Sequence, residues 1–331
     1  MSASGEMVQG PAYRDRSVGL VLFGLLEVLM GVLALLMVPM LFAMTMMHVP
    51  GQTPPAPRMM APAAILYGVV GIGFIWLGIG SILARRWARA LMLVISWFWL
   101  VIGVFSLVFW ILWGTELQTE FARQGKQLPP DAMLVAQIVG TATLGCMYLI
   151  LPGILALFYG GPNVKATCEH RDPRPRWTDR CPLPVLALVL VFAFSWFSLV
   201  SAPFYDFTAP VFGRVLTGLP GAALYLGVAI LMVYLAWGFY KLRVLAWILA
   251  VLLFVVGTAS GIVTMLHMDF AGLYAHMGIP QDQVKIITDF LAAKRLSVVW
   301  LLGVVSALYL AYLLFVGKYF FAARKERRRA H

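Results

Sequence analysis

The sequence predicts an all-α polytopic membrane protein. Of its 331 residues, 62% are hydrophobic and only 12% are charged, and the apolar residues form continuous runs. A soluble domain carries about 25% charged residues. Continuous apolar runs of about 20 residues are typical of membrane-spanning helices, whereas the strands of a membrane barrel alternate between apolar and polar residues. These observations exclude a soluble domain, a disordered chain and a membrane barrel.

Eight segments are long enough to span a bilayer as helices. The first contains Pro39, where we expect a kink or the end of the helix because proline has no N–H to donate. Arg14 and Arg16 precede this run as in a signal peptide, but the run far exceeds the usual 7–15 residues or so, which predicts an uncleaved first span. The predicted spans are Val18–Met47, Ala63–Leu83, Ala90–Trp113, Leu134–Tyr159, Leu183–Tyr205, Ala222–Tyr240, Val244–Leu266 and Ser297–Phe321.

The distribution of Lys and Arg predicts the orientation. With the N-terminus inside, eighteen of these residues fall in inner segments and seven in outer segments, while the acidic residues divide almost evenly. Cytoplasmic loops carry the excess of positive charge, so we expect both termini in the cytoplasm and a bacterial inner membrane as the location. The basic residues form short clusters without interleaved aromatic residues, which excludes a nucleic-acid groove. The net charge of +11 is thus an orientation signal.

The two halves of the chain share sequence features. Three residues of the first half recur in the second half at a constant offset of 158, and an aromatic-Ala-x-x-Gly pattern recurs at Phe121 and Tyr274. These matches predict two tandem four-helix repeats in parallel orientation, residues 1–160 and 183–331, joined by a charged cytoplasmic linker, 161–182. The last repeat ends in a basic cytoplasmic tail. The matched residues are Gly80 with Gly238, Arg85 with Arg243, and Ala88 with Ala246.

Small and charged residues indicate how the spans pack and what lies outside them. Glycines in a membrane helix let two backbones approach closely, and the second span is rich in them. Asp282, Lys285 and Asp289 lie at i, i+3 and i+7, which predicts one polar face of an extracytoplasmic helix in the second half. The glycines of the second span are Gly68, Gly71, Gly73, Gly78 and Gly80.

Glu27 is the candidate intramembrane ionisable residue. It lies two to three turns into the first predicted span, and no Lys, Arg or His lies at a comparable depth to neutralise it. Ionisable residues in a membrane are functional candidates. Two interpretations follow, namely a neutral, hydrogen-bonded structural carboxyl and a site that relays protons or binds a cation.

Haem and standard catalytic motifs are disfavoured. A membrane haem bundle needs histidines on facing helices, but all five histidines fall in loops, at span ends or at the terminus. Cys168, His170 and Cys181 supply three possible zinc ligands in the linker, although their spacing matches no standard zinc finger. No catalytic residue and no resident cofactor is predicted.

Methionine and histidine gather on the predicted outer side. Thioether and imidazole ligands suit Cu(I), and each outward histidine has a methionine neighbour, so copper is a possible cofactor there. Methionine is also a common apolar filler of membrane helices. The candidate metal ligands are Met44, Met46, Met47, His48, Met59, Met60, His267, Met268, His276 and Met277.

The sequence therefore favours a non-catalytic integral membrane protein. We expect an accessory or scaffold subunit of a membrane complex, or a small-ligand-binding module, whose partners are the lipid bilayer and other membrane subunits. The alternative is a transporter or channel with a pathway between the two repeats near Glu27. Copper binding at the outer Met and His residues is the third hypothesis.

Overall fold

The prediction of an all-α polytopic protein is confirmed by the fold. The structure, a computed structural model, describes residues 13–46, 57–124, 130–277 and 281–329. Eight of its helical segments are long and apolar enough to cross a membrane. These segments are Ser17–Ala43, Met60–Ile82, Arg86–Gly114, Gln137–Gly160, Leu183–Tyr205, Gly218–Tyr240, Val244–His267 and Thr288–Arg329.

The first half forms four spans, and their internal structure differs from the prediction in two places. The first helix continues through Pro39 to Met46, because a membrane helix can make up for one lost backbone bond through neighbouring groups. The fourth span contains a π-helical turn, η1, between two α-helices. The elements are α1 (Ser17–Met46), α2 (Pro57–Ile82), α3 (Arg86–Gln124), α4 (Pro130–Gly145), η1 (Cys146–Ile150) and α5 (Leu151–Gly160).

The second half also forms four spans, with two features that the sequence did not predict. The fifth span is broken into three pieces, and a short antiparallel hairpin follows it, in which Ala209 pairs with Leu216. The elements are α7 (Leu183–Phe194), α8 (Trp196–Ser201), η3 (Ala202–Tyr205), β1 (Ala209–Val211), β2 (Arg214–Leu216), α9 (Gly218–Tyr240), α10 (Val244–His267), α11 (Phe270–His276) and α12 (Gln281–Arg329).

The polar segment before the last span is not a separate helix. Residues 281–296 form the beginning of α12, which runs without a break for 49 residues. The expected face of Asp282, Lys285 and Asp289 thus belongs to the membrane helix itself. The short α11 precedes it as a distinct element. The sequence has no helix breaker in this stretch, which explains the continuity.

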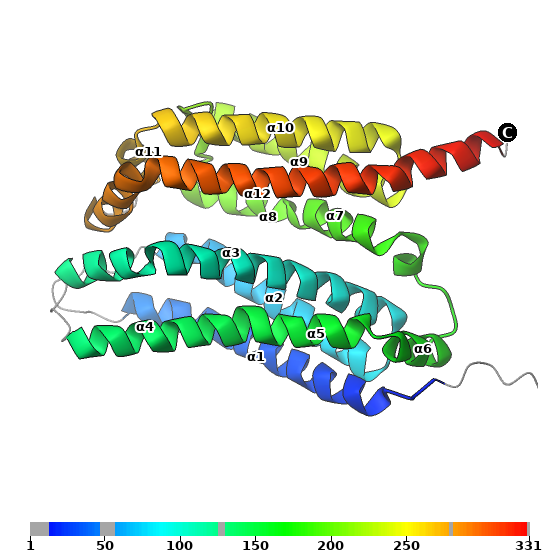
Figure 1. Cartoon of the computed structure of the whole chain (residues 1–331). Coiled ribbons are helices and arrows are strands. Elements are labelled where there is room, and N and C mark those ends of the chain that lie inside the picture. The colour runs from blue at the N-terminus through cyan, green and yellow to red at the C-terminus, as the bar shows by residue number, and fades with distance from the viewer. Residues whose placement is uncertain (1–12, 47–56, 125–129, 278–280, 330–331) are drawn as a thin grey trace, which may run out of the picture.

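The helices form two groups along the chain (Figure 1). Helices α1 to α5 lie together, and α7 to α12 lie together beside them. The connecting segment forms α6 (Pro162–Arg171) and the 3-10 turn η2 (Trp177–Arg180). The start of α1, the connecting segment and the end of α12 all lie at the same end of the molecule. We call this the basic end, because it carries Arg14, Arg16 and the arginines at the end of α12.

Helices α1 and α2 pack through facing glycines. A Cβ atom added to Gly78 would lie 2.6 Å from the carbonyl oxygen of Gly24, and one added to Gly31 would lie 2.6 Å from that of Gly71. These distances leave no room for a side chain, so the backbones are in direct contact. By contrast, added Cβ atoms at Gly68 and Gly73 would meet nothing within 4 Å. Only part of the predicted glycine stripe therefore mediates helix packing.

The turn between α2 and α3 and the turn between α9 and α10 have the same backbone geometry. Each passes through one non-glycine residue with φ near 50°. In each, an arginine N–H donates to the carbonyl of a glycine five residues earlier, at 2.9 and 2.8 Å, which is a Schellman arrangement. That glycine lies against an alanine of the next helix. The matching pairs, all 158 residues apart, are Gly80 and Gly238, Ala84 and Leu242, Arg85 and Arg243, and Ala88 and Ala246.

A buried carboxylate, Asp172, links the connecting segment to the α2–α3 turn. The side chain of Asp172 is 3% exposed, and it accepts bonds from Arg176 Nε at 2.9 Å and Nη2 at 2.7 Å. Arg85 Nη1 lies 3.9 Å from the same carboxylate. Arg86 pairs with Glu169 and Asp179 at 3.4 and 3.3 Å. The arginines of the α2–α3 turn are thus neutralised by acidic residues of the connecting segment.

Candidate functional site

Glu27 lies in a cluster of three polar side chains that come from three helices of the first half. Ser81, near the end of α2, donates from Oγ to Glu27 Oε2 at 2.9 Å. Tyr159, near the end of α5, lies with its hydroxyl 2.5 Å from Glu27 Oε1 and 2.9 Å from Ser81 Oγ. Helical side chains lean toward the N-terminus of their own helix. The carboxyl of Glu27 therefore reaches toward the basic end, where α2 and α5 end.

The cluster is closed to solvent. Glu27, Ser81 and Tyr159 are each 0% exposed. Tyr159 belongs to an apolar core that includes Leu20, Met92 and Leu155, and Phe23 packs against it with ring centroids 6.4 Å apart. The Glu27 carboxyl has only hydroxyl partners among the residues that the structure describes. An unpaired carboxylate in such a place would lose its hydration without a cation to offset that loss.

The number of available protons indicates which state of Glu27 fits the cluster. Three oxygen–oxygen contacts join the three side chains, and each contact needs one proton. Serine and tyrosine supply one each, and a carboxylate supplies none. A protonated Glu27 supplies the third. Tyr159 then donates to Ser81, Ser81 donates to Oε2, and the carboxyl O–H donates to Tyr159, which closes a ring in which every contact has its proton.

In the second half, the corresponding position is occupied by phenylalanines. Phe239 lies 158 residues after Ser81, in the matching turn, and is 0% exposed. It contacts Phe192 and Phe320 with ring centroids 4.9 and 4.8 Å apart, both edge to face. Phe192 is the tenth residue of α7, as Glu27 is the eleventh of α1. The buried positions of α5 recur in α12 at an offset of 161: Pro152 with Leu313, Leu155 with Val316, Ala156 with Gly317, and Tyr159 with Phe320.

The contrast between the two halves bears on why the polar cluster is present. Three aromatic rings packed edge to face fill the position in the second half, and buried aromatic pairs stabilise a core. A buried carboxyl with two hydroxyls contributes less, because its hydrogen bonds must first offset the desolvation of each polar group. Packing alone therefore does not require polar side chains at this position, which makes the cluster of Glu27, Ser81 and Tyr159 the candidate functional site.

The sequence identified Glu27 but missed its two partners. Ser81 and Tyr159 are separated from Glu27 by 54 and 132 residues, and hydroxyl side chains are ordinary in membrane helices. One available signal was the spacing of Gly24 and Gly31, which equals that of Gly71 and Gly78. This match sets the register of α1 against α2 and brings Ser81 within reach of Glu27.

The structure describes only some of the candidate copper ligands. Met47 and His48 lie outside the described residues, as do the side chains of Met44, Met46, Met59 and His276. Met268 is 3% exposed, and His267 Nδ1 lies 3.2 Å from the carbonyl oxygen of Val263. Met60 and Met277 are half-buried. These four described residues are not brought together by any contact that would define a metal centre.

The two linker cysteines lie in different cores. Cys168 packs in the core that contains Tyr159, whereas Cys181 packs in the core of the second half with Val185 and Leu186. Burial raises the pKa of the Cys168 thiol to about 11 and that of Cys181 to about 12. Within the described ranges, no group of three or more His, Cys, Asp or Glu residues could hold a metal ion. The structure therefore does not bring Cys168 and Cys181 together in one core, and the linker zinc site stays an untested hypothesis.

Comparison of the chain with known protein families, with curated proteins and with solved structures finds no match.

Proposed function

We propose that the protein is a membrane transport protein whose first half binds and releases a proton at Glu27. The observation that carries this proposal is the closed ring of Glu27, Ser81 and Tyr159, which is complete only with a protonated carboxyl. Release of that proton opens one of the three contacts and leaves a buried charge. The free energy of the closed arrangement thus depends on whether the proton is bound, as a proton-coupled conformational change requires.

The location of the ring changes the expected pathway, which the sequence placed between the two repeats. Glu27 contacts α2 and α5 of its own half, so the proton site lies inside the first four-helix group rather than at the boundary of the two groups. Ser81 and Tyr159 are the second residue from the end of α2 and of α5. The proton therefore has a short route to the basic end and a long one to the opposite side.

We further propose that the two halves arose as tandem copies in parallel orientation. The matching α2–α3 and α9–α10 turns support this, as do the matching buried positions of α5 and α12. The concentration of Lys and Arg supports a cytoplasmic basic end and a bacterial inner membrane. In this proposal, the first copy keeps a proton site and the second copy fills the same position with phenylalanine.

Proton flux into proteoliposomes tests the transport proposal. Wild-type protein in vesicles with an imposed potential is expected to acidify the lumen faster than empty vesicles. Glu27→Gln, which keeps the shape of the side chain but cannot lose a proton, is expected to reduce the rate to that of empty vesicles. Tyr159→Phe removes one oxygen of the ring and is expected to give an intermediate rate.

The matched control for this experiment is Glu326→Gln, which changes an exposed glutamate at the end of α12. Its flux is expected to equal that of the wild type. Equal rates for wild type and Glu27→Gln would overturn the transport proposal.

The accessory-subunit hypothesis stays a second proposal. The most apolar window of the last span is only 6% buried, against 28% and 33% for the second and third spans, so α12 has the most surface to offer a partner. Extraction from the native membrane in mild detergent tests this. A co-purifying membrane protein that is lost on Leu308→Lys, which changes an exposed residue of α12, would support it, whereas a lone protomer would contradict it.

Copper binding on the outer side also stays a proposal, since the candidate ligands lie mostly outside the described residues. Metal analysis after loading with Cu(I) tests it, with His267→Ala and His276→Ala as variants. Copper retained by the wild type and lost in both variants is the expected result.

A further inference from the structure

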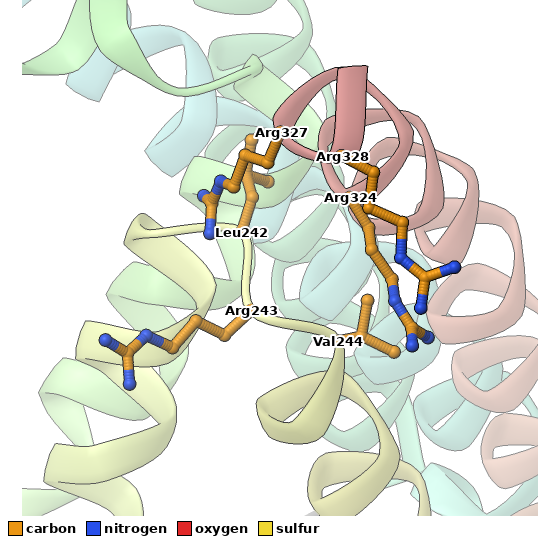
Figure 2. A pocket seen from close by; sticks show the side chains of 6 residues that line it. All are labelled: Leu242, Arg243, Val244, Arg324, Arg327 and Arg328. Carbon is orange, nitrogen blue, oxygen red and sulfur yellow. The ribbon is translucent and has the colours of Figure 1, made fainter. Parts of the chain in front are cut away.

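A second feature lies at the basic end of the second half. An open pocket of about 430 Å³ is lined by the α9–α10 turn and by the end of α12 (Figure 2). Four of its six lining residues are arginines. Its two apolar residues, Leu242 and Val244, lie where α10 enters the membrane-spanning segment. The pocket therefore lies at the boundary between the apolar span and the aqueous side. The lining arginines are Arg243, Arg324, Arg327 and Arg328.

One of the arginines, Arg327, binds the end of α12 to the α9–α10 turn. Arg327 donates from Nη2 to the carbonyl oxygen of Lys241. Arg243 lies with its guanidinium carbon 4.0 Å from the centroid of the Trp237 ring, on the side of the turn away from α12 in Figure 2. These contacts fix Arg327 and Arg243 in place. The other two lining arginines, Arg324 and Arg328, are available to bind a ligand.

Arg324 and Arg328 point in the same direction. They lie at i and i+4 on α12, so their side chains are neighbours on one face of the helix, and Figure 2 shows the two guanidinium groups side by side. Like charges at this spacing repel. Neither forms an ion pair with a carboxylate within the described parts of the chain, and Glu326, two residues away from each, points to another face. An external anion would relieve the repulsion.

In the first half, the arginines of the matching turn are neutralised by acidic residues of the chain itself. At the matching α2–α3 turn, Arg85 and Arg86 are paired with Asp172, Glu169 and Asp179. Within the ranges that the structure describes, no acidic residue forms an ion pair at the α9–α10 turn, where arginines from α12 gather instead. The pocket thus carries positive charge, and no carboxylate of the described residues pairs with Arg324 or Arg328.

We infer that this pocket binds the phosphate of an anionic ligand. Guanidinium groups bind phosphate oxygens through paired, charge-assisted hydrogen bonds. The ligand comes either from the headgroup of an anionic phospholipid in the same membrane face or from a soluble phosphate. The position at the membrane boundary favours the headgroup, since basic pockets on the inner side of membrane helices bind such lipids.

Lipid binding to the purified, delipidated protein tests this inference. Retention of phosphatidylglycerol is measured by native mass spectrometry, with phosphatidylcholine as the zwitterionic reference. Arg324→Gln with Arg328→Gln is expected to lower the affinity for phosphatidylglycerol about thirtyfold, since each basic residue near anionic lipid contributes about 1 kcal/mol. The matched control is Lys325→Gln with Arg329→Gln, which removes the same charge from exposed positions of α12 outside the pocket.

A second arm distinguishes the two sources of phosphate. Pyrophosphate is added to protein in phosphatidylcholine micelles, and its binding is measured by the shift in unfolding temperature. Pyrophosphate binding that depends on Arg324 and Arg328, without preference for phosphatidylglycerol, would support the site with a soluble ligand. If both double variants lose phosphatidylglycerol equally, or if neither ligand binds the wild type, the inference is overturned.

Discussion

Gly78→Leu is expected to destabilise the protein by about 3 kcal/mol or more. A Cβ atom at this position would lie 2.6 Å from the carbonyl oxygen of Gly24 and 2.9 Å from the backbone nitrogen of Val28. Both of these atoms belong to the backbone of α1, so α1 must move away as a unit. Overpacking a close contact typically costs about 1–3 kcal/mol, and more where the neighbour cannot adjust. Thermal unfolding in detergent, followed by tryptophan fluorescence, measures the change.

The control for this prediction is Gly73→Leu, on the same helix. A Cβ atom there would meet nothing within 4 Å, so leucine is accommodated, and it also favours the helix by up to about 1 kcal/mol over glycine. Its unfolding temperature is expected to equal or exceed that of the wild type. A similar loss of stability in both variants would contradict the role of Gly78 in the close packing of α1 on α2.

The same substitution also connects packing to the candidate site. Gly24 and Glu27 lie one turn apart on α1, and Ser81 lies three residues after Gly78 on α2. Separation of the two helices therefore breaks the contact between Ser81 and Glu27. We expect Gly78→Leu to abolish proton flux at temperatures where the protein is still folded.

Asp172→Asn is expected to destabilise the protein by about 2–3 kcal/mol at neutral pH. Asp172 accepts two bonds from Arg176 and approaches Arg85. Removing one partner of a buried charged pair leaves the other uncompensated, although Arg176 is 34% exposed and water limits the loss. Glu326→Gln, which removes an exposed carboxylate, is expected to leave the unfolding temperature unchanged. Equal effects of the two substitutions would contradict a structural role for Asp172.

The Asp172 ion pair also predicts how stability depends on pH. The hydrogen bonds from Arg176 lower the pKa of Asp172, against the opposing effect of burial. The unfolded carboxyl has a pKa of about 4. A lowered folded pKa means that the stabilisation is complete above about pH 4 and is lost as the pH falls through the folded value. The wild type should therefore lose stability on acidification in this range, and Asp172→Asn should lose less.

The eight spans were predictable from the sequence because hydropathy and length alone define them. The breaks within the spans were not. The fifth span ends at Asp206 and Phe207 with φ near 50°, which depends on the hairpin that follows. The fourth span contains a π-helical turn at Cys146–Ile150. Pro203 lies next to the first of these breaks, and Gly145 and Pro152 flank the second, but none of these residues specifies the form that the break takes.

Of the three residues in the candidate site, only the ionisable one, Glu27, could be predicted from the sequence. A carboxyl in an apolar run stands out, whereas Ser81 and Tyr159 become notable only once α1, α2 and α5 are packed together. The phenylalanines of the second half could be matched to them only after the turns at Ala84 and Leu242 had been aligned in space. Similarly, the sequence places Arg324 and Arg328 only in a basic tail. The pocket that they line could be recognised only once the structure placed them beside the α9–α10 turn.

Infrared difference spectroscopy between neutral and alkaline pH tests most directly whether Glu27 holds a releasable proton. Exposed carboxyls are already ionised at neutral pH, so they contribute no protonated-carboxyl band. The wild type is expected to show such a C=O band at neutral pH, to lose it reversibly on alkalinisation, and to lack it altogether as Glu27→Gln. Glu326→Gln should behave as the wild type. A band that persists in Glu27→Gln, or one that never titrates in the wild type, would contradict a reversible proton site at Glu27.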